Sequence, residues 1–177
     1  IDPSALPSDP IPVRTLLSDS ETTSLRGTLK RDLNSTTQGT FTLSLEDNAT
    51  RSFNGLPGLV LTRDSDRLNG TASAVLDGFL GDSWRWTLTG NYERSETDTV
   101  TQRGSGTTRL PDDTANSVSQ TLSSELVLNG DVLELPAGGI SSTFRFGADT
   151  RSLDSTSLRS GVISERSQSR DRLNGQA

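Results

Sequence analysis

Residues 68–93 read LNGTASAVLDGFLGDSWRWTLTGNYE, and this stretch decides the fold. Small or apolar side chains occupy every second position of residues 68–76, and apolar or aromatic ones do so in residues 84–92. A period of two residues is typical of a β-strand with one apolar face. In a helix, at about 100° per residue, Trp84, Trp86 and Leu88 would scatter around the axis. The polar turn at residues 77–82 therefore predicts an antiparallel hairpin.

The same alternation appears before and after this hairpin. Leu25 and Leu29 lead to a turn at residues 33–36, after which Phe41, Leu43 and Leu45 alternate with polar residues. A later pair of runs is joined by a turn that includes residues 136–139. The expected hairpins cover about residues 22–46, 67–93 and 118–150. The segment Asp66–Gly70 recurs as Asp171–Gly175, which predicts the stub of a seventh strand.

Three polar stretches separate these hairpins, at about residues 47–66, 94–116 and 151–170, and we expect them to be long, irregular loops. Residues 1–21 contain Pro3, Pro7, Pro10 and Pro12 and are expected to be irregular and loop-like. Short turns on one rim and long loops on the other predict an all-β, antiparallel up-and-down meander. Residues 22–177 would then form about six strands and a stub.

The composition leaves two structural classes open. Only 29% of the residues are hydrophobic and 5% are aromatic, which suits either a disordered chain or a membrane barrel. Alternation, expected strands of about 9–11 residues and Trp84, Trp86 and Tyr92 near strand ends favour the barrel. The ordinary alternative for these aromatic residues is the core of a soluble sandwich. Because the smallest such barrels have about eight strands, we expect an incomplete part of a larger transmembrane barrel.

Charge and residue types exclude several functions. The net charge of −6 argues against a nucleic-acid partner, which requires clustered basic residues. The chain has no Cys and no His, so it lacks thiolate ligands and the commonest general base and metal ligand. Neither catalysis nor a metal or cofactor site is expected.

Four segments resemble the barrel of proteobacterial TonB-dependent receptors. They are residues 51–58 (RSFNGLPG), 68–72 (LNGTA), 81–95 (GDSWRWTLTGNYERS) and 135–138 (LPAG). The resemblance implies a 22-stranded outer-membrane barrel with an N-terminal plug, which takes up scarce nutrients such as ferric siderophores with energy from the TonB complex. It also implies three partners: outer-membrane lipid, the rest of the barrel with its plug, and TonB. This sequence departs from the family by lacking a TonB box, a plug and an aromatic-ended final strand, so we expect a fragment.

Arg51, Arg94 and Arg151 each precede a serine after an expected outgoing strand. If the short turns are periplasmic, these arginines would lie at the extracellular rim. They could form a basic collar that binds anionic ferric chelates or lipopolysaccharide phosphates. The alternative interpretation is that arginine is simply common at strand ends in this chain.

Two other functional classes remain open from the sequence. A surface structural or adhesive protein, such as an autotransporter-like passenger, would share the acidity and the Ser/Thr richness. Such a passenger should repeat about every 20–25 residues. A disordered Ser/Thr-rich segment is the third interpretation, and the alternating strands argue against it.

Overall fold

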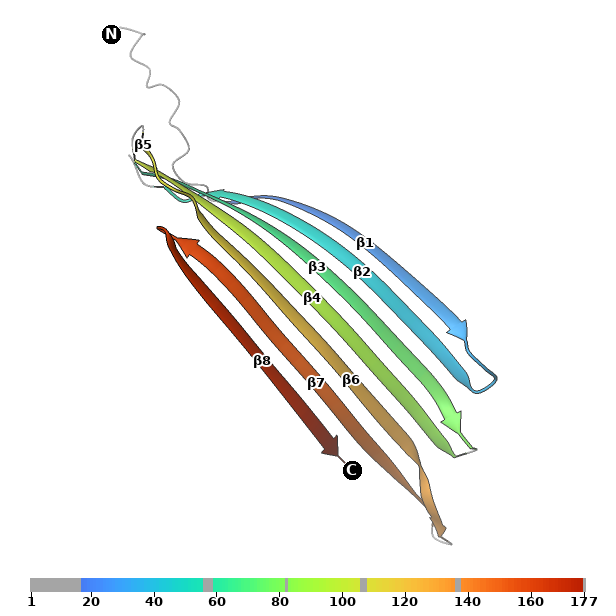
Figure 1. Cartoon of the computed structure of the whole chain (residues 1–177). Coiled ribbons are helices and arrows are strands. Elements are labelled where there is room, and N and C mark those ends of the chain that lie inside the picture. The colour runs from blue at the N-terminus through green and yellow to red at the C-terminus, as the bar shows by residue number, and fades with distance from the viewer. Residues whose placement is uncertain (1–16, 56–58, 82, 106–107, 136–137, 177) are drawn as a thin grey trace, which may run out of the picture.

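The computed structural model describes residues 17–55, 59–81, 83–105, 108–135 and 138–176. These residues form a single antiparallel β-sheet (Figure 1). Its strands are β1 (Asp19–Asp32), β2 (Thr37–Phe53), β3 (Leu59–Leu80), β4 (Trp84–Ser105), β5 (Thr108–Arg109), β6 (Asp113–Leu135), β7 (Gly138–Arg159) and β8 (Val162–Gln176). Among the described residues, no helix has the length and apolar character needed to cross a membrane.

The sheet is an open meander. Its strand order is β1-β2-β3-β4-β6-β7-β8, and the two-residue strand β5 pairs with β4 at one end of the sheet. Each long strand pairs antiparallel with the long strand that follows it in the sequence. The predicted fold class, an all-β up-and-down meander that does not close on itself, is therefore confirmed.

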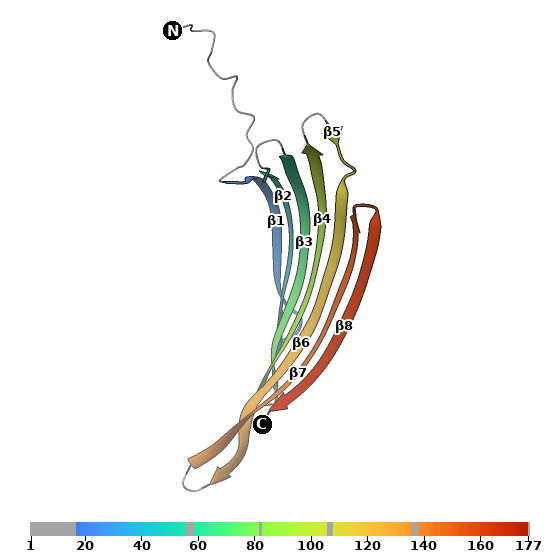
Figure 2. The ribbon, with the colours of Figure 1, turned by 90° about the vertical axis from the view of Figure 1, so that its left-hand side faces the viewer.

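The sheet is a single curved layer, and Figure 2 shows no second layer against either face. In the described part of the chain, no hydrophobic or polar side chain is buried. The residues there that are buried are all glycines: Gly39, Gly55, Gly78 and Gly130. A two-sided sheet without a core cannot bury enough apolar surface to offset the entropy of ordering its chain. The sheet therefore needs an apolar environment against one of its faces.

The strands are longer than the sequence predicts. Strands β3, β4 and β7 each contain 22 residues, and β6 contains 23. Most residues of the three stretches expected to be irregular loops instead continue these strands. The expected stub is also a full strand, because β8 contains 15 residues. The prediction of long loops on one rim is thus wrong.

Polar pairs across the strands account for this extension. Asn48 Nδ2 donates to Thr22 Oγ1 at 2.6 Å, and Asn116 Nδ2 donates to Asp98 Oδ1 at 2.8 Å. The backbone ladder requires no apolar side chain, and short polar side chains on facing strands add hydrogen bonds of their own. A strand that is polar on both faces therefore continues without the alternation that marks a strand in the sequence.

The connections at both ends of the sheet are correspondingly short. Strands β7 and β8 are joined by Ser160 and Gly161 alone, with φ values of 49° and 81°. Positive φ at both central residues matches the two-residue turn preferred by twisted hairpins. The predicted turn at residues 77–82 is also narrower, because β3 continues to Leu80.

Two further expectations meet the limits of the described residues. Residues 136–137 of the turn expected at 136–139 lie outside them, as do residues 1–16 of the segment expected to be irregular. Within the described part of that segment, Asp19 already begins β1.

A passenger with a regular repeat of 20–25 residues would coil into short parallel strands. The long antiparallel strands do not have that arrangement.

Candidate functional site

The register of the sheet divides the side chains between two faces. Directly paired residues of antiparallel strands point to the same side, and successive residues alternate. Leu43, Ala72, Tyr92 and Leu122 are paired in one row across β2, β3, β4 and β6, so they share a face. The adjacent row contains Ser44, Thr71, Glu93 and Thr121, which share the other face. We name these the apolar face and the polar face.

The apolar face carries a continuous band of apolar side chains, which we call the apolar band. Its larger members are Leu25, Leu29, Phe41, Leu43, Leu45, Leu76, Leu80, Trp84, Trp86, Leu88, Tyr92, Leu122, Leu126, Leu128, Phe144, Phe146 and Leu173. Many are exposed, with 66% exposure at Leu43 and 85% at Leu173. A contiguous exposed apolar surface of this kind marks a membrane or protein contact.

The apolar band runs obliquely to the strands. On β1 it ends at Leu25, and the paired row that contains Leu25 reaches β8 at Ser169. On β8 the band ends at Leu173, four residues beyond Ser169. The strands of a membrane barrel are tilted, so a level boundary must cross successive strands at shifted positions. The boundary of the apolar band shifts in this way.

Aromatic residues mark both limits of the apolar band. Trp84 and Phe144 stack near the end of the sheet at which β4 begins, with ring centroids 6.0 Å apart and an interplanar angle of 20°. Tyr92 lies at the other limit, and its hydroxyl donates to Gln120 Oε1 at 3.4 Å. The sequence placed Tyr92 near a strand end, whereas β4 continues past it to Ser105. Tyr92 therefore marks the end of the apolar band and not the end of the strand.

Charge is distributed unequally between the two faces. Beyond the apolar band, the apolar face becomes acidic, with Glu21, Asp47, Asp64, Asp66, Glu96, Asp98, Asp154 and Glu165. Most described basic residues lie on the polar face: Arg26, Lys30, Arg63, Arg67, Arg85, Arg103, Arg145, Arg151, Arg159, Arg166, Arg170 and Arg172. The polar face can therefore attract anions, although the net charge of the chain is negative.

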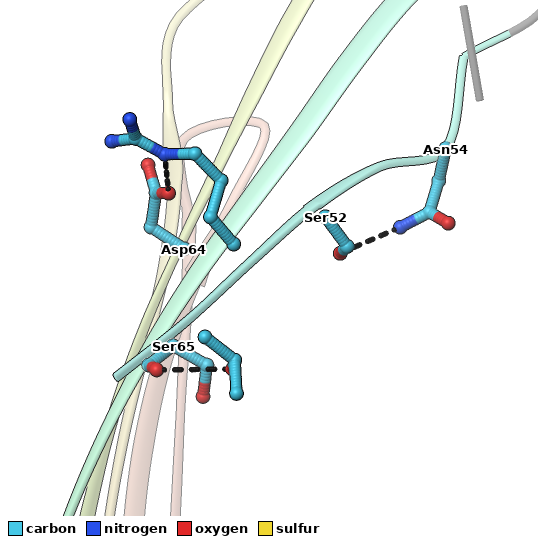
Figure 3. A network of polar contacts seen from close by, with 6 residues as sticks. Ser52, Asn54, Asp64 and Ser65 are labelled. Atoms are coloured by element: carbon cyan, nitrogen blue, oxygen red, sulfur yellow. Dashed lines mark hydrogen bonds and ion pairs between the residues drawn. The ribbon is translucent and has the colours of Figure 1, made fainter. Parts of the chain in front are cut away.

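Arg51 lies near the end of β2, on the acidic part of the apolar face. Its Nε donates to Asp64 Oδ1 at 2.6 Å, and Figure 3 shows this contact beside Ser65 and the pair formed by Ser52 and Asn54. The hydrogen bond that Arg51 donates to Asp64, followed by the charge of that carboxylate, raises the pKa of Arg51. Arg51 is thus already paired with a carboxylate of its own sheet.

The other two predicted arginines lie in the middle of their strands. Arg94 on β4 shares the face of Arg51, and its Nη2 lies 3.2 Å from Glu96 Oε2. Arg151 on β7 lies on the polar face, and its Nε is 3.9 Å from Asp149 Oδ2. Arg51 and Arg94 lie in rows that cross β3 at Asp64 and Gly70, six residues apart. The expected collar at one rim is therefore wrong, while a ligand-binding role for each arginine stays a prediction.

The arginines of β8 are not among the residues predicted from the sequence, because the polar stretch at residues 151–170 predicts a loop. The signal was present in the stretch SERSQSRDR at residues 164–172. There Arg166, Arg170 and Arg172 are separated by even numbers of residues, which places them on one face of a strand.

Within the described ranges, no group of three or more acidic, His or Cys residues is arranged to hold a metal ion.

Comparison with known proteins identifies the fold. No protein-family model and no curated protein matches the chain. Solved structures do match it: the ferric yersiniabactin uptake receptor FyuA from Yersinia pestis aligns with 89% of the chain at 12% identity and a TM-score of 0.59. The siderophore receptor PiuA from Acinetobacter baumannii aligns with 89% at 14% identity and a TM-score of 0.64. The ferric citrate transporter FecA aligns with 87% at 10% identity and a TM-score of 0.55.

The aligned regions are parts of larger proteins. The chain covers 25% of FyuA, 29% of PiuA and 24% of FecA. FyuA is an uptake receptor, PiuA is a siderophore receptor and FecA is a transporter. The sheet therefore has the fold of a segment of the barrel wall of TonB-dependent siderophore receptors.

Proposed function

We propose that this chain forms part of the barrel wall of an outer-membrane TonB-dependent receptor that takes up a scarce nutrient such as a ferric siderophore. The observation that carries the proposal is the division of the sheet between an oblique apolar band and a polar, arginine-rich face. Such a division suits a wall with lipid on one side and a hydrated lumen on the other.

The proposal gives each surface a partner. Outer-membrane lipid would cover the apolar band. The edge strands β1 and β8 would pair with other strands of the barrel, because unpaired backbone groups in lipid cost several kcal/mol each. The polar face would surround the plug and the path of the nutrient, and the TonB complex would supply energy through other parts of the receptor.

The test is iron uptake in the native host. The gene that encodes the chain is deleted, and cells are grown under iron limitation with radiolabelled ferric siderophores of several chemical classes. We expect at least one siderophore to lose most of its uptake, to recover it on complementation, and to lose it again when the TonB complex is inactivated. Unchanged uptake of every chelate in the deletion strain would contradict the proposal.

Localisation is measured in the same cells. The native gene product should fractionate with outer membranes and should migrate differently on gels before and after heating, as closed barrels do. Recovery in the soluble fraction would contradict the proposed place in the membrane independently of the nutrient.

A further inference from the structure

Two arginines face each other directly on the polar face. Arg151 of β7 is the register partner of Arg170 of β8, so their side chains leave the sheet side by side. Like charges at directly paired positions of an antiparallel sheet are destabilising. Arg166 and Arg172 lie on the same face of β8 and add positive charge on both sides of this pair.

Asp149 of β7, the register partner of Arg172, supplies a carboxylate beside this pair. The Nε atom of Arg151 is 3.9 Å from Asp149 Oδ2, and 67% of the Arg151 side chain is exposed. In the described part of the chain, no ion pair joins Arg166, Arg170 or Arg172 to a carboxylate. This arrangement differs from that of Arg51, which is held by Asp64 at 2.6 Å.

The arginine pair borders an open groove of about 450 Å³ across β6, β7 and β8. Side chains from the polar face line it: Ser119, Thr121, Arg151, Leu153, Gln168 and Arg170. Guanidinium, hydroxyl and amide groups all donate hydrogen bonds, and a guanidinium matches the geometry of a carboxylate or phosphate. The groove therefore favours a ligand rich in anionic oxygen atoms.

The position of the groove indicates where its ligand comes from. On β7 and β8 the apolar band ends at the paired residues Ala148 and Leu173. Arg151 and Arg170 each lie three residues beyond that limit and on the opposite face of the sheet. A lipid headgroup would contact the other face, so the groove is open to a ligand dissolved in water.

We propose that Arg151 and Arg170 form a binding site for a soluble polyanion rich in carboxylate oxygens, such as an anionic ferric chelate. The choice of an iron chelate rests on the proposed function, whereas the preference for anions rests on the groove. The two guanidinium groups bind the ligand from adjacent strands, and Thr121 and Gln168 add neutral donors.

The site is tested by calorimetry on the purified native protein in detergent, with ferric citrate as the anionic probe and a neutral ferric trihydroxamate as the second probe. Arg151→Gln and Arg170→Gln should each raise the Kd for ferric citrate by roughly 10-fold or more, because each removes a charge-assisted hydrogen bond. Arg151→Lys should lose less affinity, because it retains the charge without the bidentate geometry.

Arg63→Gln is the matched control, because Arg63 lies on the polar face of β3 outside the groove and loses the same charge. It should leave the Kd for ferric citrate unchanged. Heat-modifiability of each variant on gels verifies that it folds. Wild-type affinity in both glutamine variants, or an equal loss in Arg63→Gln, would overturn the site.

Uptake assays in cells separate this site from the proposed function. If ferric citrate binds and the glutamine variants weaken binding while no chelate is transported, the site stands and the receptor function fails. If chelates are transported and the glutamine variants take up anionic ones as well as the wild type does, the receptor function stands and the site is wrong.

Discussion

The indole ring of Trp84 on β4 covers Gly130, its direct register partner on β6. A Cβ atom placed on Gly130 would lie 2.5 Å from Cδ2 of that ring, which no real Cβ atom could tolerate. Trp86 covers Gly78 on β3 in the same way, at 2.7 Å from Cε2. An aromatic side chain packed across a glycine of the neighbouring strand compensates for the side chain that the glycine lacks. These pairs fix the two indole rings at the limit of the apolar band that lies where β4 begins.

Gly130→Ala should therefore destabilise the sheet. The new methyl group must displace the Trp84 ring, and overpacking of this kind typically costs about 1–3 kcal/mol. The free energy of unfolding is measured by urea titration of the native protein in micelles. Gly90→Ala is the control, because a Cβ at Gly90 meets no atom within 4 Å, and its stability should equal or slightly exceed that of the wild type. Equal effects of the two substitutions would contradict the packing of Trp84 on Gly130.

The assignment of the two faces predicts opposite responses at adjacent residues. Ala74 lies on the apolar face near the middle of the apolar band, and Ser73 lies on the polar face. Ala74→Arg should cost about 2–4 kcal/mol in a bilayer, because it places a charge near the midplane of the lipid. Ser73→Arg should cost far less. Unfolding in lipid vesicles measures both, and a larger loss for Ser73→Arg would reverse the assignment of the faces.

The two tryptophans should report how deep in the membrane their end of the apolar band lies. Trp84 and Trp86 are expected at the membrane interface, where the amphipathic indole is favoured. Their fluorescence should be quenched more strongly by lipids brominated near the headgroup than by lipids brominated near the end of the acyl chain. The difference between the wild type and the double variant Trp84→Phe/Trp86→Phe isolates their signal. Stronger quenching by lipids brominated near the end of the acyl chain would place Trp84 and Trp86 in the membrane interior.

The ion pair between Arg51 and Asp64 should respond to salt but not to moderate changes of pH. Its side chains are 61% and 26% exposed, so dissolved ions screen it. A double-mutant cycle with Arg51→Gln and Asp64→Asn should give a favourable coupling at low salt that disappears near 1 M salt.

Because Asp64 raises the pKa of Arg51, the charge pair stabilises the fold through the neutral range and up to the ordinary pKa of arginine. That contribution is lost only as the pH rises through the raised value, so titration of Arg51 should not change the coupling between pH 7 and 9. A coupling that is insensitive to salt, or one that weakens on going from pH 7 to 9, would contradict this description.

The sequence by itself determined the strands that have an apolar face. In residues 68–76 and 84–92 alternation predicts each strand and its apolar face, because successive side chains of a strand point to opposite faces. The short turns and the antiparallel order follow from the spacing of those runs. The all-β, antiparallel class of the fold was therefore predictable without coordinates.

Only the tertiary structure decided how far the strands continue and which charged residues meet. Residues 162–170 contain no apolar alternation, and their strand exists because the backbone of β7 pairs with them along its length. The pairing of Arg151 with Arg170 follows from the register set by the turn at Ser160 and Gly161. A shift of one residue would move either arginine to the opposite face, so a sequence pattern alone cannot determine which of them lie side by side.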